Sequence, residues 1–341
     1  MMRSLRALAA LAFLAALCAP AAAQTSPTLA KIRERGELIC GSSPGVAGFS
    51  IQDATGRWNG FDTDICRALA AAIFDDQDKI KFIPLSSKDR LIALQAGEID
   101  VLPRTTTWTL SRNLSQGVTF TTVNYYDGQG FMVPKKLGVT SASKLDGASI
   151  CVAQGTTSEL NLADYFRRNR MKYEVAAFGT AEEALKAYES GRCDAYTTDI
   201  SSLSAVRLKL QDIDNHVILP DVISKEPLGP WVRTGDEGWF NLVRFTVLAL
   251  VNAEELGVTK ANVREMLKSD NPEIKRFLGL EGKFGEALGL TNDWTVRMIA
   301  AVGNYGESFD RYLGKGSRLG LERGPNALWT NGGLQYAPPF R

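Results

Sequence analysis

Two stretches of this chain repeat the same alternation of strands and helices, and this pattern constrains the fold more than any other feature. The first stretch has expected strands at 37–41, 81–84 and 99–102, with a helix at 88–96. The second has expected strands at 148–153, 173–178 and 194–197, with helices at 159–168 and 181–190. Strands that alternate with helices predict an α/β fold with mostly parallel sheets flanked by helices.

The two stretches superpose at a constant offset of 94 residues. At that offset a helix-ending glycine, an aspartate that opens a strand and a polar residue just after it coincide: Gly97 with Gly191, Asp100 with Asp194, and Thr105 with Asp199. Glycines that end helices and aspartates that open strands are common in α/β proteins, and this general explanation has about the same weight as a functional one. The alternative is two similar lobes whose strands end at one cleft, where open α/β sheets bind ligands.

The N-terminus has the pattern of a secretory signal peptide. Arg3 and Arg6 precede an apolar run at 8–17, and small residues at 21–23 form a cleavage site before Gln24. The run is shorter than the ~20 apolar residues that a membrane span needs. Leu17 before Cys18 argues against lipoprotein processing. We therefore expect residues 1–23 to be removed from an exported, periplasmic protein.

Charge and histidine content exclude several functions. The formal net charge is +1, and loss of Arg3 and Arg6 leaves the chain close to neutral, which does not favour binding to nucleic acid or anionic lipid. His216 is the single histidine, so a histidine-rich metal centre is impossible and a histidine-dependent hydrolase would have to use this one residue. We expect no metal and no cofactor.

The most informative motif is the segment 60–70, Gly-Phe-Asp-Thr-Asp-Ile-Cys-Arg-Ala-Leu-Ala. Its two acids, Asp62 and Asp64, suit the positive end of a helix dipole. The segment resembles the signature of the periplasmic solute-binding proteins of polar amino-acid ABC transporters. From about Thr28 onwards, the chain is similar to the general L-amino-acid-binding proteins of that family.

The resemblance implies a two-lobed periplasmic-binding-protein fold with two hinge strands and a helical C-terminal extension. The hinge strands are expected within 125–131 and 226–230. The expected division is lobe 1 at 28–127, lobe 2 at 128–228, a return to lobe 1 at 229–258, and the extension and tail at 259–341. In the extension we expect helices at 260–268, 273–278 and 293–312, and no regular structure from 319 onwards.

Four cysteines remain after the signal peptide: Cys40, Cys66, Cys151 and Cys193. An even number in an exported protein predicts two disulfides, for which three connectivities are possible. We favour Cys40–Cys66 and Cys151–Cys193, because each bond then closes within one lobe. Four buried free thiols are the alternative.

The resemblance also implies a site for the charged head of an amino acid. Arg112 would form the planar fork for the α-carboxylate, which arginine binds through two parallel hydrogen bonds. Thr105 and Thr107, in the preceding loop, would add carbonyl and hydroxyl contacts. From lobe 2, Thr157 or Thr156 would add donors at a helix N-terminus, and Asp199 would bind the ammonium group.

These residues also have simpler explanations. Arg112 could be a surface arginine at a helix start, and Asp199 the N-cap of the next helix. Arg104 is expected to be solvated or paired locally. Where narrow-specificity relatives place a stacking aromatic, this chain has Val46, and no nearby charge would recognise an acidic or basic side chain. The expectation is broad specificity for L-amino acids.

The predicted function is therefore capture of free L-amino acids by a monomer and their delivery to the permease of an ABC transporter. One alternative is an exported enzyme on the same fold, such as a prephenate-type dehydratase, with Glu159 and Asp127 as acid–base candidates. Another is a sensor or scaffold in a larger assembly.

Overall fold

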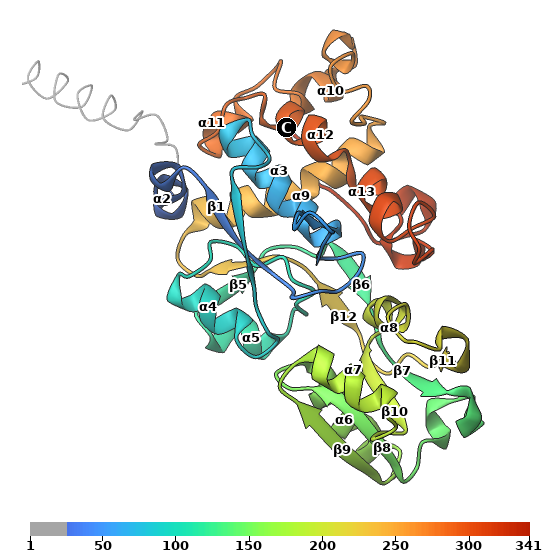
Figure 1. Cartoon of the computed structure of the whole chain (residues 1–341). Coiled ribbons are helices and arrows are strands. Elements are labelled where there is room, and N and C mark those ends of the chain that lie inside the picture. The colour runs from blue at the N-terminus through green and yellow to red at the C-terminus, as the bar shows by residue number, and fades with distance from the viewer. Residues whose placement is uncertain (1–25) are drawn as a thin grey trace, which may run out of the picture.

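The computed structural model describes residues 26–341, which form two lobes and a helical C-terminal part (Figure 1). The predicted signal peptide lies outside the described residues. Within 26–341, no helix is both long enough and apolar enough to cross a bilayer.

Lobe 2 is built on one five-stranded sheet with the order β11-β7-β10-β8-β9. β8 is parallel to β9 and β10, whereas β7 is antiparallel to β10 and β11. Alternate strand residues face opposite sides: Phe131 and Ile150 pack with α6, and Met132 and Cys151 pack with α7 and α8. The bounds are β7 Gln129–Pro134, β8 Ala148–Ala153, α6 Thr157–Arg168, β9 Tyr173–Phe178, α7 Ala181–Glu189, β10 Ala195–Asp199, α8 Ile200–Arg207 and β11 His216–Ile218.

Lobe 1 has the same strand order in a looser form. β1 (Leu38–Ser42) is parallel to β4 (Ile80–Pro84), and β13 (Trp231–Arg233) is antiparallel to β5 (Val118–Phe120). The two pairs are joined through residues 101–102, by the bridges Cys40–Val101 and Leu102–Trp231. The strand expected at 99–102 is thus present only as these bridges.

The 94-residue correspondence is confirmed in detail. Gly97 and Gly191 end their helices with φ of 81° and 79°. The Asp100 carboxylate accepts the Ile39 N–H and the Asp194 carboxylate accepts the Ser149 N–H, each at 2.8 Å. Each aspartate therefore joins the opening of its own strand to the neighbouring strand in the same way.

Two antiparallel strands, β6 (Tyr125–Asp127) and β12 (Glu226–Leu228), cross between the lobes, as expected for the hinge. Tyr126 lies opposite Pro227, which has no N–H, so the peptide groups of Tyr126 point to the other edge. There the Asn326 side chain accepts the Tyr126 N–H (2.7 Å) and donates to its carbonyl (3.0 Å). The C-terminal tail therefore borders a crossing strand.

The signature segment forms α3 (Phe61–Phe74), and its two acids face different partners. Gly60 precedes it with φ 141°, and a Cβ there would lie 2.2 Å from the Phe49 carbonyl oxygen, so only glycine fits. The buried Asp62 accepts the Thr105 N–H (3.0 Å) of the predicted site loop. The buried Asp64 accepts hydrogen bonds from Ser308 and Arg311 of the extension.

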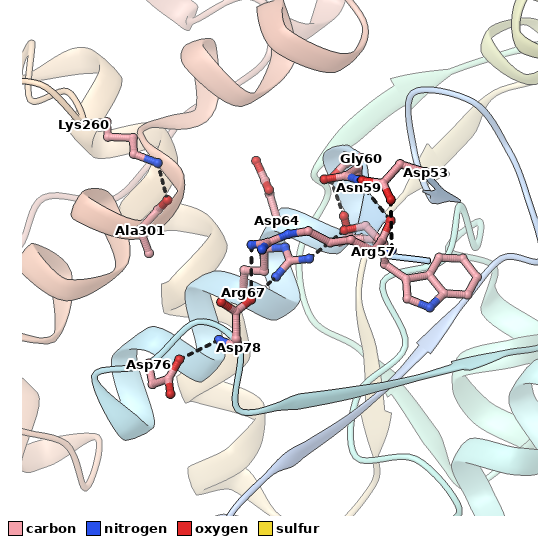
Figure 2. A network of polar contacts seen from close by, with 12 residues as sticks. Asp53, Arg57, Asn59, Gly60, Asp64, Arg67, Asp76, Asp78, Lys260 and Ala301 are labelled. Carbon is pink, nitrogen blue, oxygen red and sulfur yellow. Dashed lines mark hydrogen bonds and ion pairs between the residues drawn. The ribbon is translucent and has the colours of Figure 1, made fainter. Parts of the chain in front are cut away.

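Arg67, in the same helix, holds the turn that precedes it (Figure 2). Its guanidinium donates to Asp78 (2.9 Å) and to the Trp58 carbonyl (2.6 Å), and Arg57 contacts the same Asp78 (3.2 Å). These contacts fix α3 against both flanking turns, and with it the position of Asp62.

The extension packs on α3 and α9 (Glu237–Glu255), on the side of lobe 1 away from lobe 2 (Figure 1). The prediction of a single helix at 293–312 is wrong, because two helices occupy this segment. Gly303 (φ 83°) ends α12 (Trp294–Val302), and Asn304 with Glu307 forms the capping box of α13 (Tyr305–Tyr312). The helix expected at 260–268 is reduced to a 3₁₀ turn at Met266–Lys268.

The remaining elements are short. They are α2 Pro27–Arg35, β2 Ile51–Gln52, β3 Trp58–Asn59, α4 Arg90–Ala96, α5 Leu110–Ser115, α10 Pro272–Phe277 and α11 Phe284–Ala287, with 3₁₀ turns at Lys135–Leu137, Ala142–Lys144, Ile213–Asn215, Gly324–Asn326 and Trp329–Asn331. The last two turns lie in the tail, where no regular structure was expected.

The structure confirms the favoured disulfide pairing. Cys40 is bonded to Cys66 in lobe 1, with 6.4 Å between their Cα atoms, and Cys151 is bonded to Cys193 in lobe 2, at 5.6 Å. Each bond closes within one lobe, so neither connects the two.

Candidate functional site

A polar cleft lies between the lobes, at the carboxyl ends of the strands. It is lined by Val46, Ser87, Arg90, Arg104, Thr105 and Thr107 from lobe 1, and by Ala153, Thr156, Thr157, Ser158, Ala181, Tyr196, Thr198, Asp199, Ser202 and Val206 from lobe 2. Five of the six predicted ligand-binding residues are therefore brought together. The sixth, Arg112, lies behind Thr107 and does not line the cavity.

Arg112 links the two lobes in this structure. It lies in α5, is 8% exposed, and donates to the Thr107 carbonyl (3.0 Å) of lobe 1 and the Gly155 carbonyl (3.3 Å) of lobe 2. It is therefore a buried arginine and not a surface residue. Burial lowers its pKa, which the nearby Glu226 and Asp199 oppose. The role predicted for it remains a proposal.

Glu226, in the returning hinge strand, organises the two threonines and was not predicted from the sequence. It is 1% exposed and accepts hydrogen bonds from the hydroxyls of Thr107 (2.6 Å) and Thr157 (2.8 Å). Asn161 donates to its other oxygen (2.7 Å). Its sequence context, Glu-Pro-Leu, suggested only a hinge strand, because its partners come from distant segments.

The lobes are in contact at the rim of the cleft, so the conformation is closed. The Lys209 ammonium of lobe 2 donates to the Gly45 carbonyl of lobe 1 at 2.6 Å. Gly155 of lobe 2 lies so near Lys88 of lobe 1 that a Cβ on it would be 2.8 Å from the Lys88 Cα. Both contacts must break when the lobes separate.

Asp199 supplies a carboxyl group to the lining of the cleft. It is 8% exposed and is the N-cap residue of α8, as the simpler explanation expected, but its side chain makes no capping hydrogen bond. Burial raises its pKa well above the ordinary value, and the nearby carboxylates of Asp127 and Glu226 add to the shift. Arg90 and Arg112 oppose the shift only in part. A cationic ligand group beside Asp199 would restore its charge.

Arg90 was missed by the sequence analysis. It begins α4, lines the cleft and is 4% exposed. Its Nε has no hydrogen-bond partner within the described residues, and its Nη1 makes only long contacts of 3.4 Å to the carbonyls of Arg104 and Thr105. Burial lowers its pKa strongly. Arg90 therefore brings a charged group to the cavity that Val46 also lines, where no charge was expected near the ligand side chain.

Arg104 was expected to be either solvated or paired locally, and in the structure it is paired locally. It donates to the Leu85 carbonyl at 2.8 Å and lies 3.5 Å from the Ser87 hydroxyl. Burial lowers its pKa to about 10. Among the residues described, the ion pairs include neither the cleft arginines Arg90 and Arg104 nor the neighbouring Arg112. Their nearby opposite charges are Asp199 and Glu226 for Arg90 and Arg112, and Asp62 and Asp199 for Arg104.

Thr105 holds a strained backbone at the cleft, with φ 33°, a value that residues other than glycine rarely adopt. The Asp62 carboxylate fixes its N–H, and Asn124 donates to the other Asp62 oxygen (3.3 Å). Burial raises the pKa of Asp62 to about 7. The signature helix thus positions the site loop.

Chemically, the cleft presents guanidinium groups and hydroxyls on one side and a buried carboxylate on the other. No cluster of three potential metal ligands occurs in 26–341, and His216 lies in β11, where it contacts Tyr188 (2.6 Å). Two similar lobes that close over such a cleft on paired hinge strands define a protein of the periplasmic solute-binding class.

Comparisons with known proteins agree with this class. The family of bacterial extracellular solute-binding proteins, family 3, matches residues 38–276, and the chain belongs to this family. It is 55% identical to the general L-amino acid-binding periplasmic protein AapJ of Rhizobium johnstonii, over 94% of this chain and 95% of that protein. It is 53% identical to the glutamate/glutamine/aspartate/asparagine-binding protein BztA of Rhodobacter capsulatus, over 94% and 95%.

A solved structure has the same fold over nearly the whole chain. It is an ABC transporter/periplasmic binding protein from Brucella ovis with glutathione bound, with a TM-score of 0.91 and 57% identity, covering 93% of this chain and 100% of that one. Like these relatives, the protein is a periplasmic binding protein and not an enzyme, so the dehydratase alternative is not supported.

Proposed function

We propose that this protein binds free L-amino acids by their α-carboxylate and α-ammonium groups and delivers them to an ABC transporter. The observation that carries the proposal is the convergence, in one cleft, of buried arginines that lack a carboxylate partner and a buried aspartate with a raised pKa. A zwitterion supplies both missing counter-charges at once. The names of the relatives AapJ and BztA support an amino acid as that zwitterion.

In this proposal Arg112 and the Thr156–Thr157 helix start bind the carboxylate, while Asp199 and the Thr105 carbonyl bind the ammonium group. Arg112 would exchange its weaker bond to Gly155 for a charge-assisted bond to the ligand. Thr107 and Thr157 would contribute hydroxyls that Glu226 orients. The groups come from both lobes, so the full set is available only when the cleft is closed.

Arg90 would read the ligand side chain. Its unpaired Nε favours amino acids that carry an acceptor, such as a carboxylate or amide oxygen. Val46 leaves space for other side chains, which agrees with broad specificity. Glutathione carries the same α-amino and α-carboxylate groups on its γ-glutamyl residue, so the ligand of the Brucella ovis relative is compatible with this recognition of the head.

Transport would use the opening and closing of the two lobes. The segments 28–127 with 229–258, and 128–228, are the proposed moving bodies, and β6 with β12 is the hinge between them. Ligand stabilises the closed form because only there are Arg112 and Asp199 both paired. A membrane permease that recognises the closed form would then receive the amino acid.

The direct test is calorimetry and thermal unfolding of the mature protein with each of the twenty L-amino acids. We expect binding of chemically different amino acids, with the highest affinities for those that have side-chain acceptors near Arg90. D-amino acids and decarboxylated amines are the controls, because they misplace or lack one charged group. If no L-amino acid binds or raises the melting temperature, the proposal is wrong.

Affinity for amino acids is expected to fall as the pH decreases. The free protein holds Asp199 with a raised pKa, and an ammonium ligand binds its ionised form, so binding releases a proton. Protonation therefore competes with ligand below the raised pKa, by up to about tenfold per pH unit. Calorimetry between pH 5 and 9 measures the slope. Asp199→Asn should bind weakly and lose this pH dependence, and a wild-type affinity independent of pH would contradict the role of Asp199.

A further inference from the structure

A second chamber adjoins the amino-acid cleft and is not used by the proposed function. Its volume is about 190 Å³, compared with about 60 Å³ for the closed cleft itself. The two spaces share five wall residues, Val46, Ser87, Arg104, Ala181 and Val206, so they adjoin each other. A ligand bound by its head in the cleft would reach the chamber by passing between these shared residues.

Apart from Arg104, the residues shared by the two spaces have small or medium-sized side chains. Val46 and Ser87 face it from lobe 1, and Ala181 faces it from lobe 2. An aromatic ring at any of these positions would close the passage. The further walls combine apolar, hydroxyl and charged groups, and they are Ser43, Pro44, Gly45, Ser86, Thr180, Glu182, Leu185 and Lys209.

The charges along this path are arranged for a ligand with a second acidic end. Arg90, with its unpaired Nε, lies in the cleft and Arg104 at the boundary, while Lys209 lies at the solvent end. The acid of the chamber, Glu182, is paired with Lys186 at 2.7 Å and also interacts electrostatically with Lys209. The ammonium of Lys209 donates to the neutral Gly45 carbonyl, at 2.6 Å. A carboxylate would be a stronger partner for it.

We propose that the cleft and chamber together bind γ-glutamyl peptides, which are amino-acid zwitterions whose side chain continues through an amide to a terminal carboxylate. This inference rests on the proposed function, because the head is bound as in a free amino acid. The γ-carbonyl oxygen accepts from Arg90, the rest of the peptide passes between Val46 and Ala181, and its terminal carboxylate pairs with Lys209. An α-linked peptide does not fit, because its first carboxylate is consumed in the peptide bond.

The test compares L-glutamate, γ-glutamylglycine, glutathione and α-glutamylglycine by calorimetry on the mature protein. Wild type should bind the first three, and α-glutamylglycine at least tenfold more weakly than γ-glutamylglycine. Lys209→Met should weaken the γ-glutamyl peptides at least fivefold more than L-glutamate. Ser87→Phe, which fills the passage, should also reduce the affinity for the γ-glutamyl peptides more than the affinity for L-glutamate. Lys172→Met replaces a lysine elsewhere in lobe 2 and should change neither affinity.

The outcomes separate the two proposals. Binding of L-glutamate without the γ-glutamyl peptides overturns the chamber and leaves the proposed function intact. If Lys209→Met and Ser87→Phe each reduce the affinity for L-glutamate and for the peptides equally, these residues act on closure alone. That result also overturns the proposal that the chamber binds peptides. If neither L-glutamate nor any peptide binds, both proposals are wrong.

Discussion

Replacement of Arg112 by alanine should reduce the affinity for every L-amino acid by about two to three orders of magnitude. The guanidinium is buried, and a ligand carboxylate placed beside the cavity left by alanine would be desolvated without its counter-charge. Loss of one partner from such a pair costs about 2–5 kcal/mol. The bond of Arg112 to Gly155 is exchanged for the ligand in our proposal, so its loss in the variant does not add to this effect. Calorimetry with alanine, glutamine and glutamate measures it.

Two arginine variants serve as controls for this prediction. Arg90→Met should weaken glutamate and glutamine but leave alanine nearly unchanged, since Arg90 reads the side chain in our proposal. Arg264→Ala removes an exposed arginine of the extension and should change no affinity. If Arg112→Ala binds alanine like wild type while Arg90→Met does not, the carboxylate partner has been assigned to the wrong arginine.

Replacement of Gly155 by alanine should weaken every ligand at least tenfold, because the added methyl group keeps the lobes apart. Its Cβ would lie 2.8 Å from the Cα and 3.0 Å from the Cβ of Lys88, distances that carbon atoms do not adopt without movement. Closure would then stop short of the geometry in which both lobes contact the ligand. Small-angle scattering with saturating ligand should show a larger radius of gyration than wild type.

Gly138→Ala is a matched control for this substitution. Gly138 has a similar φ of 67°, against 73° for Gly155, but a methyl group added to it would have no other atom within 4 Å. Both variants therefore carry the backbone strain of a left-handed alanine, and only one blocks closure. Equal affinities for the two variants would show that the contact with Lys88 does not limit closure.

The alternation of strands and helices could be predicted because its signals are local, whereas the two-lobed fold was implied by the family resemblance. Glycines that end helices and aspartates that open strands act within a few residues, and Asp100 and Asp194 make the same contacts with the neighbouring strand in both lobes. Hydrophobic alternation then sets which strand face is buried. The disulfide pairing followed from the division into lobes.

The parts that were missed depend on contacts between distant segments. Glu226 acts on threonines 119 and 69 residues away, and no local pattern marks it. Arg90 resembled any arginine at a helix start, and only the fold shows that its Nε is buried and unpaired. Asp62 was explained by the helix dipole, whereas it fixes Thr105. Conversely, the break at Gly303 was visible in the sequence, since Asn304 and Glu307 form a capping box.

The pairing of Asn326 with Tyr126 gives the C-terminal tail a mechanical consequence. When a strand bends, the spacing of its peptide groups changes. The N–H and carbonyl of Tyr126 are both hydrogen-bonded to the Asn326 side chain, which lies outside the sheet. Separation of the lobes must therefore either move the tail together with β6 or strain the hydrogen bonds between Asn326 and Tyr126. In both cases the tail makes the hinge stiffer. Residues of the tail that do not line the cleft therefore influence how readily the two lobes separate.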